Sequence, residues 1–328
     1  MRSRNTKSGV RGAGRDACAT ALRLLIALLG SWLSSAAGQE AEILVSDQKG
    51  PAQLLADEER LYWSNLQAGT IVQLSKQGGA PIVMAADQHL IRGLAQDGEF
   101  VFWTNQNRIM KTPKGGGDPV IVATSESRGR RGPAGIAVND SHIFWSNYFQ
   151  GDGTINRMAK TGGDVEVLAT NQDGPTDLAL DETHVYWTNH VGPNKTVMRA
   201  ALDGDRPETL ATGQNNPGAI ACDPKAVYWG ADDLMIWKKS ARTAQIFVAG
   251  HRPAALALDR DRIFWTRQRL GADRVADHSQ IFSISKEGSQ PKLVHEAGGH
   301  FWGLAADGQF LYWTDWLRGT VSRIRKPK

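Results

Sequence analysis

Residues 174–189 read GPTDLALDETHVYWTN, and closely related segments recur along the chain. Two short apolar runs flank a polar turn, and the second run ends in an aromatic residue followed by tryptophan. This arrangement is typical of a β-hairpin. The aromatic-tryptophan pair occurs seven times, and its tryptophans are 40, 42, 42, 42, 36 and 48 residues apart: Trp63, Trp103, Trp145, Trp187, Trp229, Trp265 and Trp313. A period of this length predicts repeats that bury a core only by stacking on one another.

Two further apolar runs follow the hairpin in most repeats. In the third repeat they are TINRMA (154–159) and VEVLAT (165–170), and the turn between them contains Gly162 and Gly163. Four antiparallel strands in about 42 residues make one blade of a β-propeller. The sequence therefore predicts an all-β fold, a seven-bladed β-propeller of four-stranded antiparallel blades over residues 39–328. The predicted blades are 51–88, 89–131, 132–173, 174–215, 216–250, 251–298 and 299–328 plus 41–47.

The seventh repeat contains only three of the four apolar runs. A run of the missing type stands at the other end of the predicted domain, where AEILVSDQKGP (41–51) closely matches VEVLATNQDGP (165–175). We therefore expect residues 42–46 to pair with the last strands of the chain and to complete the seventh blade. Such a closure would remove the two open edges of the array.

The seven tryptophans are expected to be structural. Each blade is covered on both faces by its neighbours, and large aromatic rings can fill the space between them. A ring that stacks on a sugar or a base would instead have to be exposed. Cys222 is likewise interpreted as a core residue, because other repeats place Ala56, Val138, Leu180 and Leu258 at the same position.

The first 38 residues have the layout of a secretory signal peptide. Basic residues precede the apolar stretch LLIALLGSWL (24–33), and the small residues SSAAG (34–38) follow, with cleavage expected near Ala37 or Gly38. An uncleaved anchor is the alternative, although the apolar stretch is shorter than the roughly 20 residues that span a bilayer. No second apolar run of that length follows, so no integral membrane span is predicted after cleavage. We predict a secreted or periplasmic protein.

The charge distribution argues against nucleic acid as a partner. The full chain has a net charge of +4, but its first 38 residues contain six basic residues and one acidic residue. The predicted propeller domain is therefore close to neutral, and the sequence shows no continuous basic groove.

The seventh pair extends to the motif YWTD at residues 312–315, and the other repeats read YWSN, FWTN, FWSN, YWTN, YWGA and FWTR. The chain resembles the YWTD-type β-propellers of the low-density-lipoprotein-receptor class, and more closely their secreted bacterial relatives. The resemblance covers residues 41–328 and implies the propeller fold, but no particular activity, because propellers host many unrelated functions. Receptor-type propellers have six blades rather than seven, and only Asp315 retains the aspartate of the motif.

The predicted binding site lies where the repeat is irregular. In a propeller, the loops after the aromatic-tryptophan pairs and the connections between blades share one face, around the mouth of the central channel. Here this face combines aromatic and cationic side chains, which suit a protein loop, an anionic glycan or an acidic peptide. We predict a non-enzymatic, monomeric binding module without a cofactor, whose protein or glycan partner contacts Tyr148, Phe149, Trp302, Trp316, Arg92, Arg318 and His300.

The alternative function is a metal-assisted lyase or hydrolase, similar to propeller lactonases, with its site at the channel mouth. One position of the innermost strand reads Gln53, Gly93, Gly135, Asp177, Ala219, Ala255 and Gly303 around the ring. A single carboxylate among mostly Gly and Ala is a poor arrangement for catalysis or for metal binding. The candidate cluster for this alternative is Asp177 with Arg92 and His300, and its metal ion would be calcium.

Overall fold

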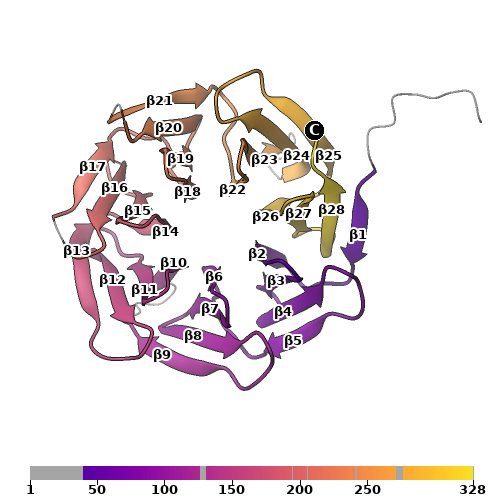
Figure 1. Ribbon diagram of the computed structural model, residues 1–328, viewed down its shortest axis with the longest axis horizontal. Coiled ribbons are helices and arrows are strands. Elements are labelled where there is room, and N and C mark those ends of the chain that lie inside the picture. Colours follow the sequence, from indigo (N-terminus) through magenta and orange to yellow (C-terminus); the bar gives the residue numbers. More distant parts are fainter. Residues whose placement is uncertain are drawn as a thin grey trace, which may run out of the picture. The chain divides into compact units, whose positions relative to one another are not determined.

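The computed structural model describes residues 40–125, 131–193, 195–204, 206–240, 242–270 and 276–327, so the predicted signal peptide lies outside the described part. Seven four-stranded antiparallel sheets are arranged in a ring (Figure 1). The predicted seven-bladed β-propeller is confirmed. None of the described residues belongs to a helix that is long and apolar enough to cross a membrane.

The strands of each blade follow one another from the channel outward, except that β1 is the outermost strand of blade 7. Blades 1 to 4 contain β2 (Pro51–Ala56), β3 (Arg60–Asn65), β4 (Thr70–Ser75) and β5 (Ile82–Ala85); β6 (Leu94–Gln96), β7 (Phe100–Asn105), β8 (Arg108–Pro113) and β9 (Val120–Thr124); β10 (Pro133–Val138), β11 (His142–Asn147), β12 (Gly153–Ala159) and β13 (Glu166–Gln172); and β14 (Pro175–Leu180), β15 (His184–Asn189), β16 (Thr196–Ala201) and β17 (Glu208–Ala211). Blades 5 to 7 contain β18 (Ile220–Cys222), β19 (Ala226–Gly230), β20 (Leu234–Lys238) and β21 (Thr243–Val248); β22 (Ala255–Leu258), β23 (Arg262–Leu270), β24 (Ala276–Ser285) and β25 (Lys292–Gly298); and β26 (Phe301–Ala306), β27 (Phe310–Asp315), β28 (Thr320–Arg325) and β1 (Glu42–Val45).

The ring is closed by the N-terminal strand, as predicted. Strand β1 pairs with β28 in an antiparallel register that places Glu42 opposite Arg323, and these two side chains form an ion pair of 2.7 Å. Leu44 and Val45 pack against the core between blades 7 and 1. Residues from both ends of the propeller domain thus build one sheet.

The motif tryptophans fill the interfaces between blades. All seven are at most 2% exposed, and Trp63 packs in one cluster with Tyr312 and Val321 of blade 7. In blades 1, 2, 4 and 5 the indole N–H donates to a glutamine side chain 15 residues earlier, at 2.9 to 3.1 Å. In blade 6 the corresponding residue is Gly250, and Trp265 Nε1 has no hydrogen-bond partner among the described residues.

The serine or threonine after the tryptophan joins neighbouring inner strands. Thr104 Oγ1 accepts a hydrogen bond from the Gly93 N–H of its own blade and donates one, at 2.7 Å, to the Ala134 carbonyl of blade 3. Blades 3, 4 and 7 use the same residue type to reach the inner strand of the next blade. This position of the motif therefore holds the channel wall together.

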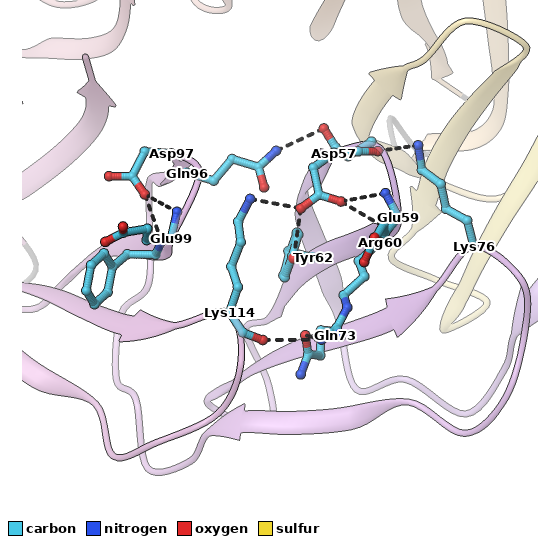
Figure 2. A network of polar contacts seen from close by, with 12 residues as sticks. Asp57, Glu59, Arg60, Tyr62, Gln73, Lys76, Gln96, Asp97, Glu99 and Lys114 are labelled. Carbon is cyan, nitrogen blue, oxygen red and sulfur yellow. Dashed lines mark hydrogen bonds and ion pairs between the residues drawn. The ribbon is translucent and has the colours of Figure 1, made fainter. Parts of the chain in front are cut away.

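A ring of lysine–aspartate pairs lies on the basal face, which we define as the face that carries the first and third turns of each blade. The aspartate stands in the first turn of one blade, and the lysine follows the third strand of the next. Figure 2 shows this contact at Asp57, whose carboxylate meets Lys114 of blade 2 at 2.8 Å and the Tyr62 hydroxyl at 2.9 Å. Equivalent pairs link five further interfaces: Lys160–Asp97, Lys239–Asp181, Lys286–Asp223, Lys326–Asp259 and Lys76–Asp307.

The interface between blades 3 and 4 lacks such a pair because both partners are replaced. Asn139 occupies the aspartate position and still accepts hydrogen bonds from the turn, from the Ser141 and His142 N–H groups. Leu202 occupies the lysine position and packs against the cluster that contains Phe144. An apolar contact thus replaces an ion pair without leaving an unpaired charge at this interface.

We expect deletion of residues 41–46 to destabilise the protein by about 3 kcal/mol, because it exposes the partly buried Leu44 and Val45 and opens the β28 edge. This loss corresponds to a fall in melting temperature of roughly 6–12 °C, measurable by circular dichroism. Gln48 is retained because it accepts the Trp63 N–H. An unchanged melting curve would refute closure by β1.

The basal ring predicts a loss of stability in acid. Burial alone would raise the pKa of Asp307, but hydrogen bonds from Lys76, from two backbone N–H groups and from Tyr312 lower it to about 2. An unfolded aspartate has a pKa of about 3.9. The stability that this ionised group contributes is therefore fully present above about pH 4 and is lost as the pH falls through 2.

We expect Lys76→Met to lower the free energy of unfolding at pH 7 by about 1 kcal/mol and to reduce the loss between pH 4 and 2. Lys225→Met is the control, since Lys225 and Glu287 are both 85% exposed and 3.8 Å apart. Denaturant titrations at several pH values measure both variants. Equal stability of the two variants throughout this range would contradict a stabilising role of the ring.

Candidate functional site

A cavity of about 640 Å³ lies in the central channel, at the end that faces the loops after the aromatic-tryptophan pairs. We call this end of the propeller the loop face. The cavity is lined by inner strands from all seven blades and by Leu66, Tyr148 and His190 from the loops. Most lining residues are small or aliphatic, and Arg92, Tyr148, Asp177 and His190 are the ones that can carry charge. Cavities of this size and composition are typical of small-molecule sites.

The small residues of the inner strands are required by packing. A Cβ atom on Gly135 would lie 2.2 Å from the Thr176 carbonyl oxygen of blade 4, and one on Gly303 would lie equally close to the Ala52 carbonyl of blade 1. Neighbouring inner strands approach too closely here for any larger residue. These glycines therefore allow the inner strands of neighbouring blades to pack closely.

Arg92 enters the cavity from the connection between blades 1 and 2. Its backbone N–H donates to the Thr104 carbonyl at 3.3 Å, and its guanidinium carbon lies 5.5 Å from the centre of the Tyr148 ring of blade 3. Burial lowers the pKa of Arg92, but an arginine remains protonated at any physiological pH. The two predicted residues thus form a cation–π pair at the cavity wall.

Asp177 stands at the position where neighbouring blades have Gly or Ala. One carboxylate oxygen accepts the Leu178 N–H at 3.0 Å, and the other accepts the Ile220 N–H of blade 5 at 3.1 Å. Burial raises the pKa of Asp177 to about 6, and the two N–H donors limit the rise. Asp177 therefore links two inner strands and also places a titratable group in the cavity.

His190 lines the same cavity but is not among the predicted site residues. Its Nδ1 lies 3.0 Å from the Pro217 carbonyl, which can only accept a hydrogen bond, so Nδ1 carries a proton. The Nε2 atom of the neutral ring is then an acceptor. The repeat places His190 directly after YWTN, but the sequence alone does not show that its ring reaches the channel.

The aromatic patch of blade 7 consists of His300, Trp302 and Trp316. The rings of Trp302 and Trp316 lie 5.4 Å apart, as do those of His300 and Trp302, and Trp302 is 39% exposed. Burial lowers the pKa of His300, with an opposing effect from Asp315. Gly50, at a φ of +68°, lets Trp316 pack closely, since a Cβ atom there would lie 2.7 Å from the indole.

Asp315, the only aspartate retained at the fourth motif position, positions this patch. One of its carboxylate oxygens accepts hydrogen bonds from the backbone N–H groups of His300, Leu317 and Arg318, at 3.0 to 3.1 Å. These residues belong to the two segments that carry the aromatic rings. The Arg318 side chain is 58% exposed, and its Nε lies 4.0 Å from Asp315. The YWTD sequence of blade 7 therefore has a local role that the asparagine motifs of other blades do not share.

The structure brings together some of the predicted residues and separates others. Arg92, Tyr148, Asp177 and Trp302 line the cavity, whereas His300 is not part of its wall. Phe149 is only 5% exposed, so it does not present its ring to a ligand. Within the described ranges, no three His, Cys, Asp or Glu side chains are arranged to hold a metal ion.

A larger cavity of about 1000 Å³ opens on the basal face between blades 5 and 6. Its wall contains the pair Lys286–Asp223, at 2.9 Å, and Lys239, which binds Asp181. Cys222 also lines it, but burial raises the pKa of this thiol to about 12, and the thiol donates to the Leu180 carbonyl. Paired charges and an unreactive thiol make this cavity a weaker candidate than the channel.

Comparison with known proteins shows the fold. No protein-family model matches the chain, and no curated protein matches it. The nidogen propeller in a nidogen/laminin complex is 19% identical, with a TM-score of 0.53 over 62% of this chain and 81% of that chain. Virginiamycin B lyase from Staphylococcus aureus is 15% identical, with a TM-score of 0.70 over 88% and 99%. A WD40-repeat domain is 13% identical, with a TM-score of 0.70 over 87% and 97%.

Asp177 predicts a specific dependence of stability on pH. Its pKa in the folded protein, about 6, exceeds the value of about 3.9 in the unfolded chain, so the folded state binds more protons between these values. When the pH falls from 7 to 5, the free energy of unfolding of the wild type should therefore rise by about 1–2 kcal/mol relative to that of Asp177→Asn. Buried histidines with lowered pKa values act in the opposite direction, but equally in both proteins. Parallel stability profiles in urea titrations would show that Asp177 has an ordinary pKa.

Proposed function

We propose that this chain is an extracytoplasmic, non-enzymatic binding module that uses the loop face of its propeller to hold a protein or glycan. The observation that carries this proposal is the aromatic patch of blade 7. The seven motif tryptophans are at most 2% exposed, whereas Trp302 is 39% exposed and lies against Trp316. Exposed aromatic residues beside arginine are frequent among the residues that contribute most to binding.

Three further observations support this assignment. Leu317 is 55% exposed and Arg318 is 58% exposed, so an apolar and a cationic side chain border the patch. The signal-peptide pattern of residues 1–38 favours export to the periplasm or the exterior. The motif resembles that of YWTD-type propellers and their secreted bacterial relatives, and the structurally similar nidogen propeller is found in a complex with laminin. We infer a monomer, because β1 completes the last blade within one chain.

A lyase or hydrolase reaction in the channel is the second candidate. Asp177 and His190 line one cavity, and the hydrogen bond of His190 leaves its Nε2 as a potential proton acceptor. Virginiamycin B lyase has a similar fold and is named as a lyase, which supports a lyase as the second candidate. Binding is favoured because His300 does not line the cavity that contains Asp177 and Arg92, so the candidate catalytic cluster is not assembled there.

We expect Trp302→Ala and Trp316→Ala to reduce recovery of the partner by at least about tenfold in a pull-down from an extracytoplasmic fraction, because each removes aromatic contact area from the patch. The control is Ile82→Ala, since Ile82 is 58% exposed but lies on the outer strand of blade 1. Circular dichroism confirms the fold of each variant. Equal recovery of every partner by all variants would show that the patch is not part of the binding site.

A further inference from the structure

The channel cavity has a composition that the proposed partner surface does not explain. The cavity lies below the aromatic patch, and Trp302 is the one member of that patch that lines it. Its volume of about 640 Å³ is within the range of about 300–1000 Å³ found for small-molecule sites. Leu54, Leu94, Ile136 and Ile220 supply apolar walls from four blades. A ligand of this cavity would therefore need an apolar body.

Arg92 supplies the permanent positive charge in this wall. It is the one lysine or arginine among the described residues that line the cavity. Its position is determined by the hydrogen bond of its backbone to Thr104 and by the contact with Tyr148. The guanidinium is planar, and its N–H donors match the two oxygens of a carboxylate.

The other polar groups of the cavity do not suit a cation. Both carboxylate oxygens of Asp177 already accept backbone N–H groups, from Leu178 and Ile220. The Tyr148 ring, which could otherwise attract a cationic ligand, is covered by Arg92 on one face. A positively charged ligand would therefore meet Arg92 without gaining a free carboxylate.

We propose that the channel cavity binds a small organic anion, in which a carboxylate is joined to an apolar body. Arg92 holds the carboxylate, and the aliphatic wall together with Trp302 holds the body. This site shares Trp302 with the partner surface proposed above, whereas Trp316 and Arg318 of that surface lie outside the cavity wall. Asp177 opposes the anion when it is ionised, because two negative charges then share one cavity.

The first test compares three ligands that share one body, using the wild-type protein. Isothermal titration calorimetry at pH 7 measures binding of 4-phenylbutyrate, 4-phenylbutanol and 4-phenylbutylamine. We expect the acid to bind at least about tenfold more tightly than the alcohol, because only the acid forms charge-assisted hydrogen bonds with Arg92. The amine should bind most weakly. Equal affinities for the three compounds, or tightest binding of the amine, would overturn the proposal.

The second test assigns the site to Arg92. Arg92→Met keeps an unbranched apolar stem but removes the charge, so we expect the preference for the acid to vanish while the alcohol still binds. Arg92→Lys should retain part of the preference, because lysine keeps the positive charge but lacks the planar arrangement of N–H donors of a guanidinium. Asp177→Asn should tighten binding of the acid, because it removes a negative charge from the cavity. An unchanged preference in Arg92→Met, or weaker binding in Asp177→Asn, would contradict the assignment.

A matched variant separates this site from the partner surface. Trp316→Ala alters the aromatic patch but leaves Arg92 and the other residues of the cavity wall in place, so it should keep the preference for 4-phenylbutyrate over 4-phenylbutanol. Loss of partner recovery in Trp316→Ala with this preference unchanged would support both proposals. Partner recovery without selective binding of the acid would leave the proposed function in place and refute the anion site.

Discussion

An ion pair between an aspartate in the first turn of one blade and a lysine of the next blade joins neighbouring blades on the basal face. The aspartate carboxylate serves two sets of groups at once: it accepts the N–H groups of its own turn, as Asp57 does from Glu59 and Arg60, and it meets a lysine of the next blade. The same lysine lies over the aromatic ring that precedes the motif tryptophan, as Lys114 does over Tyr62. A single residue therefore couples the local turn to the interface (Figure 2).

Most of the fold could be predicted because each blade repeats the same physical solution. The spacing of the tryptophans gives the number of blades, and the match between residues 41–51 and 165–175 gives the closure by β1. The lysine–aspartate ring could not be found by the same reasoning, because its partners lie in different repeats, 57 residues apart for Lys114 and Asp57 and 231 residues apart for Lys76 and Asp307. The sequence contains one signal of this contact. Asn139 of blade 3 replaces the aspartate and Leu202 of blade 4 replaces the lysine, and such correlated replacement indicates contact.

The candidate site was less predictable because it consists of exceptions to the repeat. Irregular positions can be recognised in the sequence: Arg92, Tyr148 and Trp302 were expected on one face, and the three residues line one cavity. Whether an irregular side chain points into the channel depends on loop conformation, which the pattern does not specify. Phe149 and His190 illustrate this limit: they follow the motif tryptophans of adjacent blades, but the first is buried in packing and the second lines the cavity.

The two faces of the propeller differ in how many of their polar groups are already paired with one another. On the basal face, six of the seven interfaces carry a lysine bound to an aspartate at 2.5 to 2.9 Å, and any ligand would have to compete with these internal pairs. On the loop face, two tryptophan rings in contact and an arginine over the Tyr148 ring border an open channel. A buried ion pair gains little from an additional partner, whereas an exposed aromatic surface gains by leaving water. This difference between the faces, more than the size of either cavity, is the reason why we propose the binding site on the loop face.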